Sequence, residues 1–221
     1  MFLAGDVTVE VSLRQRNMET IQPADPASLA VPPELLPTVG RSIDVAVIYD
    51  LDYLSHAGRG GTRIDDATLA ALTGTIEVAA SACGRLCYVR AACSATTAFA
   101  HRLALVGAAN NSWQAVAGRH GADTCVVAEL DNLVRAPRMR LVVLIAGGRA
   151  YADPVLALRD VGVAVWVLYR SGSLSWRLYQ AATSATPLPA VPVPVAVAAC
   201  SGERRSRVAA LPGAGPNGAP A

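Results

Sequence analysis

The sequence contains no lysine, so all 19 of its lysine and arginine positions are arginines. Its five cysteines show no C-x-x-C spacing, and an odd number of cysteines argues against a closed disulfide framework. We expect Cys83 and Cys87 to be small buried residues rather than metal ligands. The first residues lack the pattern of a signal peptide, and no apolar run reaches the roughly 18 residues of a membrane span. These absences predict a reduced, cytoplasmic protein that does not bind a membrane.

Aromatic residues are also scarce, at 5%, and the hydrophobic share of 52% comes mainly from alanine and valine. A net charge of +2 permits a local basic patch but does not by itself indicate a nucleic-acid-binding protein. The length of 221 residues suits one good-sized domain with terminal segments. We assign residues 1–41 to an N-terminal segment with a short edge strand over 6–13 and a proline-rich linker. Residues 42–189 form the α/β domain, and 190–221 form a disordered tail rich in proline, alanine and glycine.

The stretch from Ile43 to Tyr53 organises the predicted domain. Its first half is a continuous apolar run, which is typical of a strand buried on both faces of a parallel sheet. The run ends in Asp50 and Asp52. Because ligands of open α/β sheets bind at the carboxyl ends of the strands, these two carboxylates are placed for chemistry.

Strands and helices alternate through the rest of the domain. Further strands are predicted over 86–92, 140–146 and 163–169. Helices are predicted from Asp65 or Asp66 to Gly84, over 97–106, from Asp123 onward, between Asp153 and Gly162, and over 173–183. Residues 107–121 are predicted to form a polar loop. This alternation predicts a Rossmann-like or PIN-like α/β fold of three layers with a mainly parallel central sheet.

The carboxylate of Asp123 lies on the same stripe as the apolar residues of its predicted helix. Asp123 is therefore either only an N-cap or a side chain that leans over the edge of the sheet beside Asp50. Glu129 and Asp131 flank this stripe, where solvent would reach them.

Three acidic or glycine-rich segments follow one another along the predicted domain, each at the end of a strand or the start of a helix. One strand ends in Asp50-Leu-Asp52-Tyr53-Leu54, Gly121-Ala-Asp123 opens a helix with Glu129 six residues on, and a later strand ends in Gly147-Gly148-Arg149-Ala150-Tyr151. In this order and spacing, residues 42–189 resemble the NYN domain, a branch of the PIN-like metal-dependent ribonucleases. The resemblance implies that Asp50, Asp123 and Glu129 are catalytic and that Asp50, Asp123 and Asp52 bind Mg²⁺ or Mn²⁺.

Two departures from the family pattern put cleavage in question. Gly148 and Ala150 stand where the family has aspartates, and Tyr53 stands where it has asparagine. Asp50 and Asp123 could hold one ion, because Mg²⁺ keeps several waters and needs few protein ligands. A two-metal clamp would need more carboxylates than remain.

A rim of basic residues is expected in the loops that border this site, namely Arg59, Arg63, Arg119, His120 and Arg149. As a group they could contact the phosphates of single-stranded or structured RNA. Three hypotheses follow: a metal-dependent ribonuclease, a degenerate NYN fold that binds RNA or a protein without cleaving, and an unrelated small-molecule α/β enzyme that uses the loop at 58–63. The missing acids favour the second over the first. The terminal segments leave open a homodimer or a protein partner.

Overall fold

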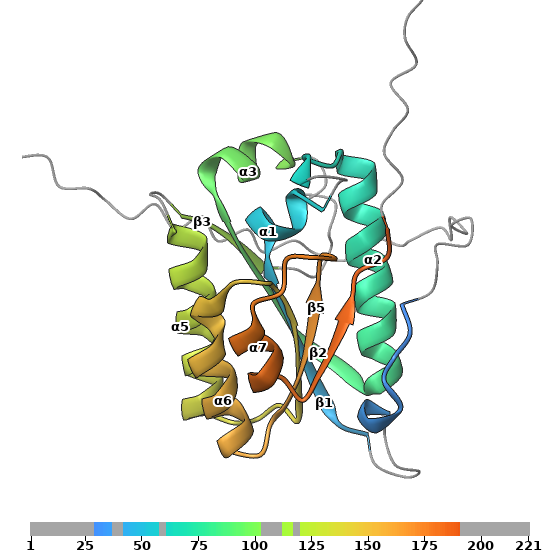
Figure 1. The fold of residues 1–221 in the computed structure, drawn as a ribbon, viewed down its shortest axis with the longest axis vertical. Helices are drawn as coiled ribbons and strands as arrows, with labels where there is room; N and C mark the ends of the chain where they lie inside the picture. The colour runs from blue at the N-terminus through green and yellow to red at the C-terminus, as the bar shows by residue number, and fades with distance from the viewer. Residues whose placement is uncertain (1–28, 37–41, 58–60, 103–111, 117–119, 191–221) are drawn as a thin grey trace, which may run out of the picture.

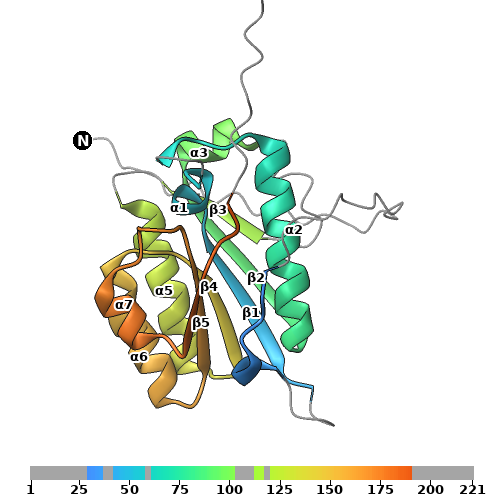
Figure 2. The same ribbon diagram turned by 45° about the vertical axis from the view of Figure 1, so that its right-hand side comes forward.

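A computed structural model of the chain describes residues 29–36, 42–57, 61–102, 112–116 and 120–190. At its centre is a sheet whose strands all run parallel, in the order β3-β2-β1-β4-β5-β6 (Figures 1 and 2). The strands are β1 (Asp44–Asp50), β2 (Arg85–Ser94), β3 (Ser112–Val116), β4 (Leu141–Ile145), β5 (Ala164–Tyr169) and β6 (Ser184–Pro187).

Helices cover both faces of this sheet. They are α1 (Leu51–Ser55), α2 (Asp66–Cys83), α3 (Ala95–Ala100), α5 (Gly121–Arg135), α6 (Ala152–Asp160) and α7 (Trp176–Ala181), with short 3₁₀ turns η1 (Pro33–Leu35) and η3 (Arg149–Tyr151). Helix α2 lies on one side of the sheet, and α5, α6 and α7 lie on the other (Figure 1). The predicted three-layer, Rossmann-like α/β fold is confirmed.

The central strands are buried on both faces. In β1, Val45 and Val47 pack in the core on the side of α2, whereas Ala46 and Ile48 pack beneath α5 and α6. Strand β4 is likewise buried at every position. This double burial explains why these strands read as unbroken apolar runs.

The structure differs from the sequence prediction at both edges of the sheet. Strand β3 lies in the predicted loop at 107–121, and β6 follows the predicted helix at 173–183, which contracts to α7. Both edge strands pair along one side only, and β6 ends in a proline, which edges tolerate. Helix α3 is described from Ala95 to Ala100, and Phe99 within it is 74% exposed. The predicted end of that helix lies outside the described residues.

The segment before the domain also contributes to the core. Leu29 and Leu35, placed in a predicted linker, are buried in the cluster that contains α2. The predicted edge strand at 6–13 and residues 191–221 of the predicted tail lie outside the described residues. Helix α6 begins at Ala152, so Asp153 lies in its first turn and is not the N-cap.

Four cysteines fall within the described residues, and all are free. Cys83 is buried as expected, but Cys87 is exposed because it lies near the start of β2, beyond the end of α2. No helix within the described residues is long and apolar enough to span a membrane.

Candidate functional site

The candidate site lies where the connections of the sheet diverge. After β1 the chain continues to β2 and β3 on one side, whereas β4 begins the other half of the sheet. In open α/β sheets this switch point leaves a crevice outside the carboxyl ends of the strands, and ligands bind there. Asp50 ends β1, and Gly147 and Gly148 follow β4 at the same edge.

Asp50 serves two elements at once. As N-cap of α1, its Oδ1 accepts a hydrogen bond of 2.9 Å from the backbone N–H of Tyr53. Only 5% of the residue is exposed. Burial is the main cause that raises the pKa of this carboxyl to about 6, and the nearby charge of Asp123 acts in the same direction.

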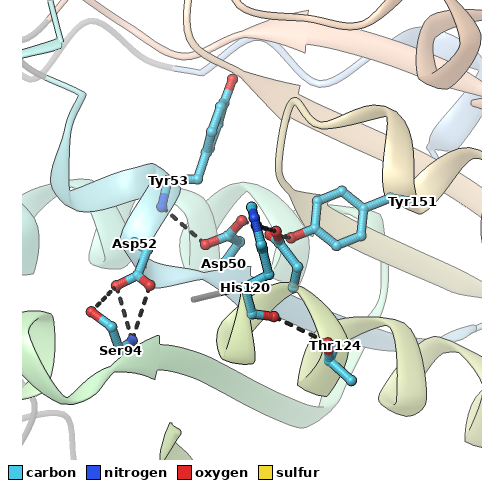
Figure 3. A network of polar contacts seen from close by, with 8 residues as sticks. Asp50, Asp52, Tyr53, Ser94, His120, Thr124 and Tyr151 are labelled. Carbon is cyan, nitrogen blue, oxygen red and sulfur yellow. Dashed lines mark hydrogen bonds and ion pairs between the residues drawn. The ribbon is translucent and has the colours of Figure 1, made fainter. Parts of the chain in front are cut away.

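Tyr151 lies between the two carboxylates that sequence analysis singled out. Its hydroxyl oxygen is 2.7 Å from Oδ2 of Asp50 and 2.6 Å from Oδ1 of Asp123. Figure 3 shows the ring pointing at Asp50 from the far side of the site. The ring belongs to the core beneath α5 and α6, and Tyr151 is 1% exposed. No motif in the sequence marks Tyr151 as a site residue; its one signal is its place directly after the positions of the two missing aspartates.

A phenol carries one proton, so it can donate to only one of these carboxylates at a time. Burial and the neighbouring Asp50 raise the pKa of Tyr151, which keeps the hydroxyl protonated. Both contacts become hydrogen bonds when Asp50 is protonated: its carboxyl group donates to Tyr151, and Tyr151 donates to Asp123. The raised pKa of Asp50 fits this arrangement.

Asp123 is not an N-cap, because α5 begins at Gly121 and its cap residue is His120. From the first turn, Asp123 reaches over the edge of the sheet toward Tyr151, which was the second of the two predicted alternatives. Its Oδ2 lies 3.2 Å from Nδ1 of His120, an exposed residue with a left-handed backbone (φ 68°). The imidazole therefore lies on the solvent side of the carboxylates.

The residues present do not fit a divalent ion between Asp50 and Asp123. Each of their four carboxylate oxygens already has a partner in Tyr53, Tyr151 or His120. An ion bridging them would have to take the place of the Tyr151 hydroxyl, whose ring is locked in the core. Within the described residues, no group of three or more His, Cys, Asp or Glu side chains is arranged to hold a metal.

The other two predicted acidic residues lie apart from this pair. Asp52 accepts hydrogen bonds from the backbone N–H (3.0 Å) and Oγ (2.9 Å) of Ser94, and so ties α1 to the junction of β2 and α3 (Figure 3). Glu129 accepts from the Tyr88 hydroxyl, and Tyr88 in turn accepts from Arg90. Tyr88 precedes Ala92, the β-partner of Asp50, by four residues, roughly 13 Å of strand.

Tyr53, where the NYN pattern has asparagine, joins three loops beneath the site. Its hydroxyl accepts from the backbone N–H of Arg170 (2.8 Å) and contacts Oγ of Ser173 (2.6 Å). The guanidinium of Arg170 lies 4.4 Å from the centre of the Tyr53 ring. Gly147 packs directly under this ring, where a Cβ atom would lie 2.5 Å from the Tyr53 hydroxyl.

Of the predicted basic rim, Arg63, Arg149 and His120 are exposed. Arg149 follows β4 by only four residues and lies beside the exposed Gly148 and Ala150, so it borders the Asp50–Tyr151–Asp123 group. Arg59 and Arg119 lie outside the described residues.

No protein-family model and no curated protein matches the chain. Among solved structures it is similar to a crystal structure of a protein of unknown function from Vibrio parahaemolyticus. The two share 13% identity over 69% of this chain and 96% of the other, with a TM-score of 0.50. At this identity the likeness concerns the fold alone.

Proposed function

We propose that this protein is a non-cleaving relative of the NYN ribonucleases that binds RNA at the carboxyl edge of its sheet. One observation carries the proposal: the hydroxyl of Tyr151 stands between Asp50 and Asp123, where a metal-dependent nuclease would hold its ion. Such a nuclease relies on its ion to lower the pKa of an attacking water and to polarise the phosphate.

Exposed basic residues near Asp50 and Asp123 support phosphate binding. His120 is exposed beside Asp123, Arg149 is exposed in η3 two residues before Tyr151, and Arg63 is exposed in the loop before α2. Below about pH 6, where Asp50 is protonated, the group that it forms with Tyr151 and Asp123 carries one negative charge fewer. A local cluster of exposed basic residues attracts a polyanion more strongly than the net charge of +2 suggests.

The deciding experiment measures cleavage and binding of the same labelled single-stranded RNA, with Mg²⁺ or Mn²⁺ present. We expect no cleavage above that of the Asp50→Asn/Asp123→Asn variant, no metal-induced rise in melting temperature, and retention of the RNA at low salt. Metal-dependent cleavage that the double variant lacks would show a working nuclease. Absence of RNA retention would overturn the other part of the proposal, that the protein binds RNA.

A charge reversal at the rim tests where RNA binds. Arg149→Glu should weaken binding by at least about threefold and lower the salt dependence by about one counterion, because it removes a phosphate contact. Arg138→Glu is the matched control, since Arg138 is exposed just before β4, at the opposite edge of the sheet. Equal losses in both variants would mean that general charge, and not this edge, attracts the RNA.

A further inference from the structure

Helix α7 displays two aromatic rings to solvent in a protein with few aromatics. Trp176 is 66% exposed and Tyr179 is 50% exposed. Their rings are stacked, with centroids 5.5 Å apart and planes 19° from parallel. Residues three apart lie on one helix face, so the pair forms a continuous surface.

This pair is not needed to anchor α7. The helix packs on the core through Leu178 and Ala181, which are buried on its opposite side. Tyr179 instead lies against one face of the indole and fixes its orientation. With 66% of Trp176 exposed, the indole offers a preformed stacking surface, and binding a ligand there costs little side-chain entropy.

The pair also lies next to the site described above. The backbone N–H of Ser175, the residue before Trp176, donates a 2.8 Å hydrogen bond to the carbonyl of Gly147. Gly147 precedes Arg149 by two residues, and the exposed Arg177 follows Trp176. This backbone contact brings the segments that carry Arg149 and Arg177 together near the aromatic rings, at the edge of the sheet where Asp50 and Tyr151 meet.

We propose that Trp176, backed by Tyr179, is a stacking platform for one unpaired nucleobase of a single-stranded RNA whose adjacent phosphates contact Arg149 and Arg177. The inference rests on the proposed RNA-binding function and adds the element that recognises a base. Aromatic rings beside guanidinium groups are the combination with which proteins hold single strands, because each base offers a π face and each nucleotide a charge. An apolar protein partner would offer no negative charge to the nearby arginines, whereas RNA phosphates would, so the observations favour RNA.

The test compares two substitutions of similar bulk, Trp176→Phe and Trp176→Leu. The probe is a fluorescently labelled 2′-O-methyl oligo(A), which resists cleavage, and affinity is read by anisotropy at low salt. Phenylalanine keeps an aromatic face, whereas leucine keeps apolar bulk without one. We expect Trp176→Leu to weaken binding by about five- to hundredfold, which is the cost of one base–aromatic stack, and Trp176→Phe to retain most of the affinity.

The control is Val78→Ala, because Val78 is a comparably exposed apolar residue on α2, which covers the other face of the sheet. This variant should bind RNA as the wild type does. Melting temperatures of all variants, and their masses by light scattering, accompany the titrations. Because Trp176 faces solvent, we expect every variant to fold and to keep the wild-type mass.

Two results would overturn the inference while leaving the proposed function intact. In one, Trp176→Leu binds RNA as tightly as the wild type, which would place the bases elsewhere. In the other, Trp176→Leu changes the mass of the assembly, which would make α7 a contact between protein chains. If the wild type does not bind the oligonucleotide at all, the proposed function and this inference fail together.

Discussion

Asp50 is the residue on which the folding energetics of the site depend most. It is held in the core by an N-cap hydrogen bond on one oxygen and by Tyr151 on the other. When both Asp50 and Asp123 are ionised, the single proton of Tyr151 cannot satisfy both, and one carboxylate faces an oxygen lone pair instead. Protonation of Asp50 removes this conflict. Between about pH 4 and pH 6 the folded protein therefore holds a proton on Asp50 that the unfolded chain releases.

This linkage predicts how stability varies with pH. The pKa of Asp50 is raised from 3.8 to about 6, so the folded state binds more protons between these values. The stabilising contribution is complete below about pH 4 and is lost as the pH rises through 6, with a total of about 3 kcal/mol. Asp50→Asn should remove this loss and be more stable than the wild type at about pH 8, because the amide can donate to Tyr151 and still cap α1.

Urea unfolding of both proteins from about pH 4 to pH 8 measures this difference. Asp153→Asn serves as the control, because Asp153 is exposed in the first turn of α6 and has no part in the group around Tyr151. If the wild type and Asp50→Asn keep a constant difference in stability across this range, Asp50 does not carry the proton.

Among the elements, the loops after β1, β4 and β5 are held together by one tyrosine. Tyr53, on α1, contacts Arg170 and Ser173 in the loop after β5 and covers Gly147 in the loop after β4. The backbone carbonyl of Gly147 also accepts a hydrogen bond from the backbone N–H of Ser175. Gly147 lies two residues before η3, which carries Tyr151, so these contacts hold the segment that leads to the site.

A methyl group at Gly147 should disrupt this packing. In Gly147→Ala the new Cβ would lie 2.4 Å from the Ser173 carbonyl oxygen and 2.7 Å from Cε2 of Tyr53, so backbone must move. We expect a loss of about 1–3 kcal/mol or more in the free energy of unfolding. The control is Gly74→Ala, where nothing lies within 4 Å of the new atom and the helix interior should gain about 0.5–1 kcal/mol. Similar effects at both glycines would show that Gly147 is not tightly packed.

For the molecule as a whole, the sheet separates two cores of different construction. The core beneath α5, α6 and α7 contains Tyr151 and supports the site, whereas the core beneath α2 also takes up Leu29 and Leu35 from the N-terminal segment. Residues 29–36 therefore belong to the folded unit, although their prolines suggested a linker. Two leucines can support a core even in a proline-rich segment, since proline does not prevent burial of its neighbours.

Substitution of two adjacent leucines tests how much residues 29–36 contribute to the stability of the fold. Leu35→Ala should destabilise the protein by about 2–5 kcal/mol, because it empties a buried position. Leu36→Ala, at the next and largely exposed residue, should change stability by no more than about 0.5 kcal/mol. Thermal or urea unfolding of the two variants gives the comparison. Equally small changes in stability for both variants would show that residues 29–36 are a linker and not part of the folded unit.

Local patterns in the sequence determined the central layers of this protein. Strands β1, β4 and β5 are buried on both faces, so their apolar runs identified them in the sequence. Helix α2 was identified by an aspartate at its N-cap and a glycine at its end. Strands β3 and β6 left no such signal, because a short edge strand with polar residues gains its stability from one neighbour. Their existence was decided by pairing with β2 and β5.

The same division applies to the site. The sequence placed Asp50 at the carboxyl end of a strand and allowed Asp123 beside it as one of two alternatives, since these positions follow from strand ends and helix starts. It could not place Glu129, because the axial rise of α5 carries that residue about 9 Å away from Asp123, toward Tyr88. Nor could it show that Tyr151 stands between the two carboxylates. That contact joins β1, η3 and α5, and only the packing of these three elements brings a hydroxyl to the place where a metal ion was expected.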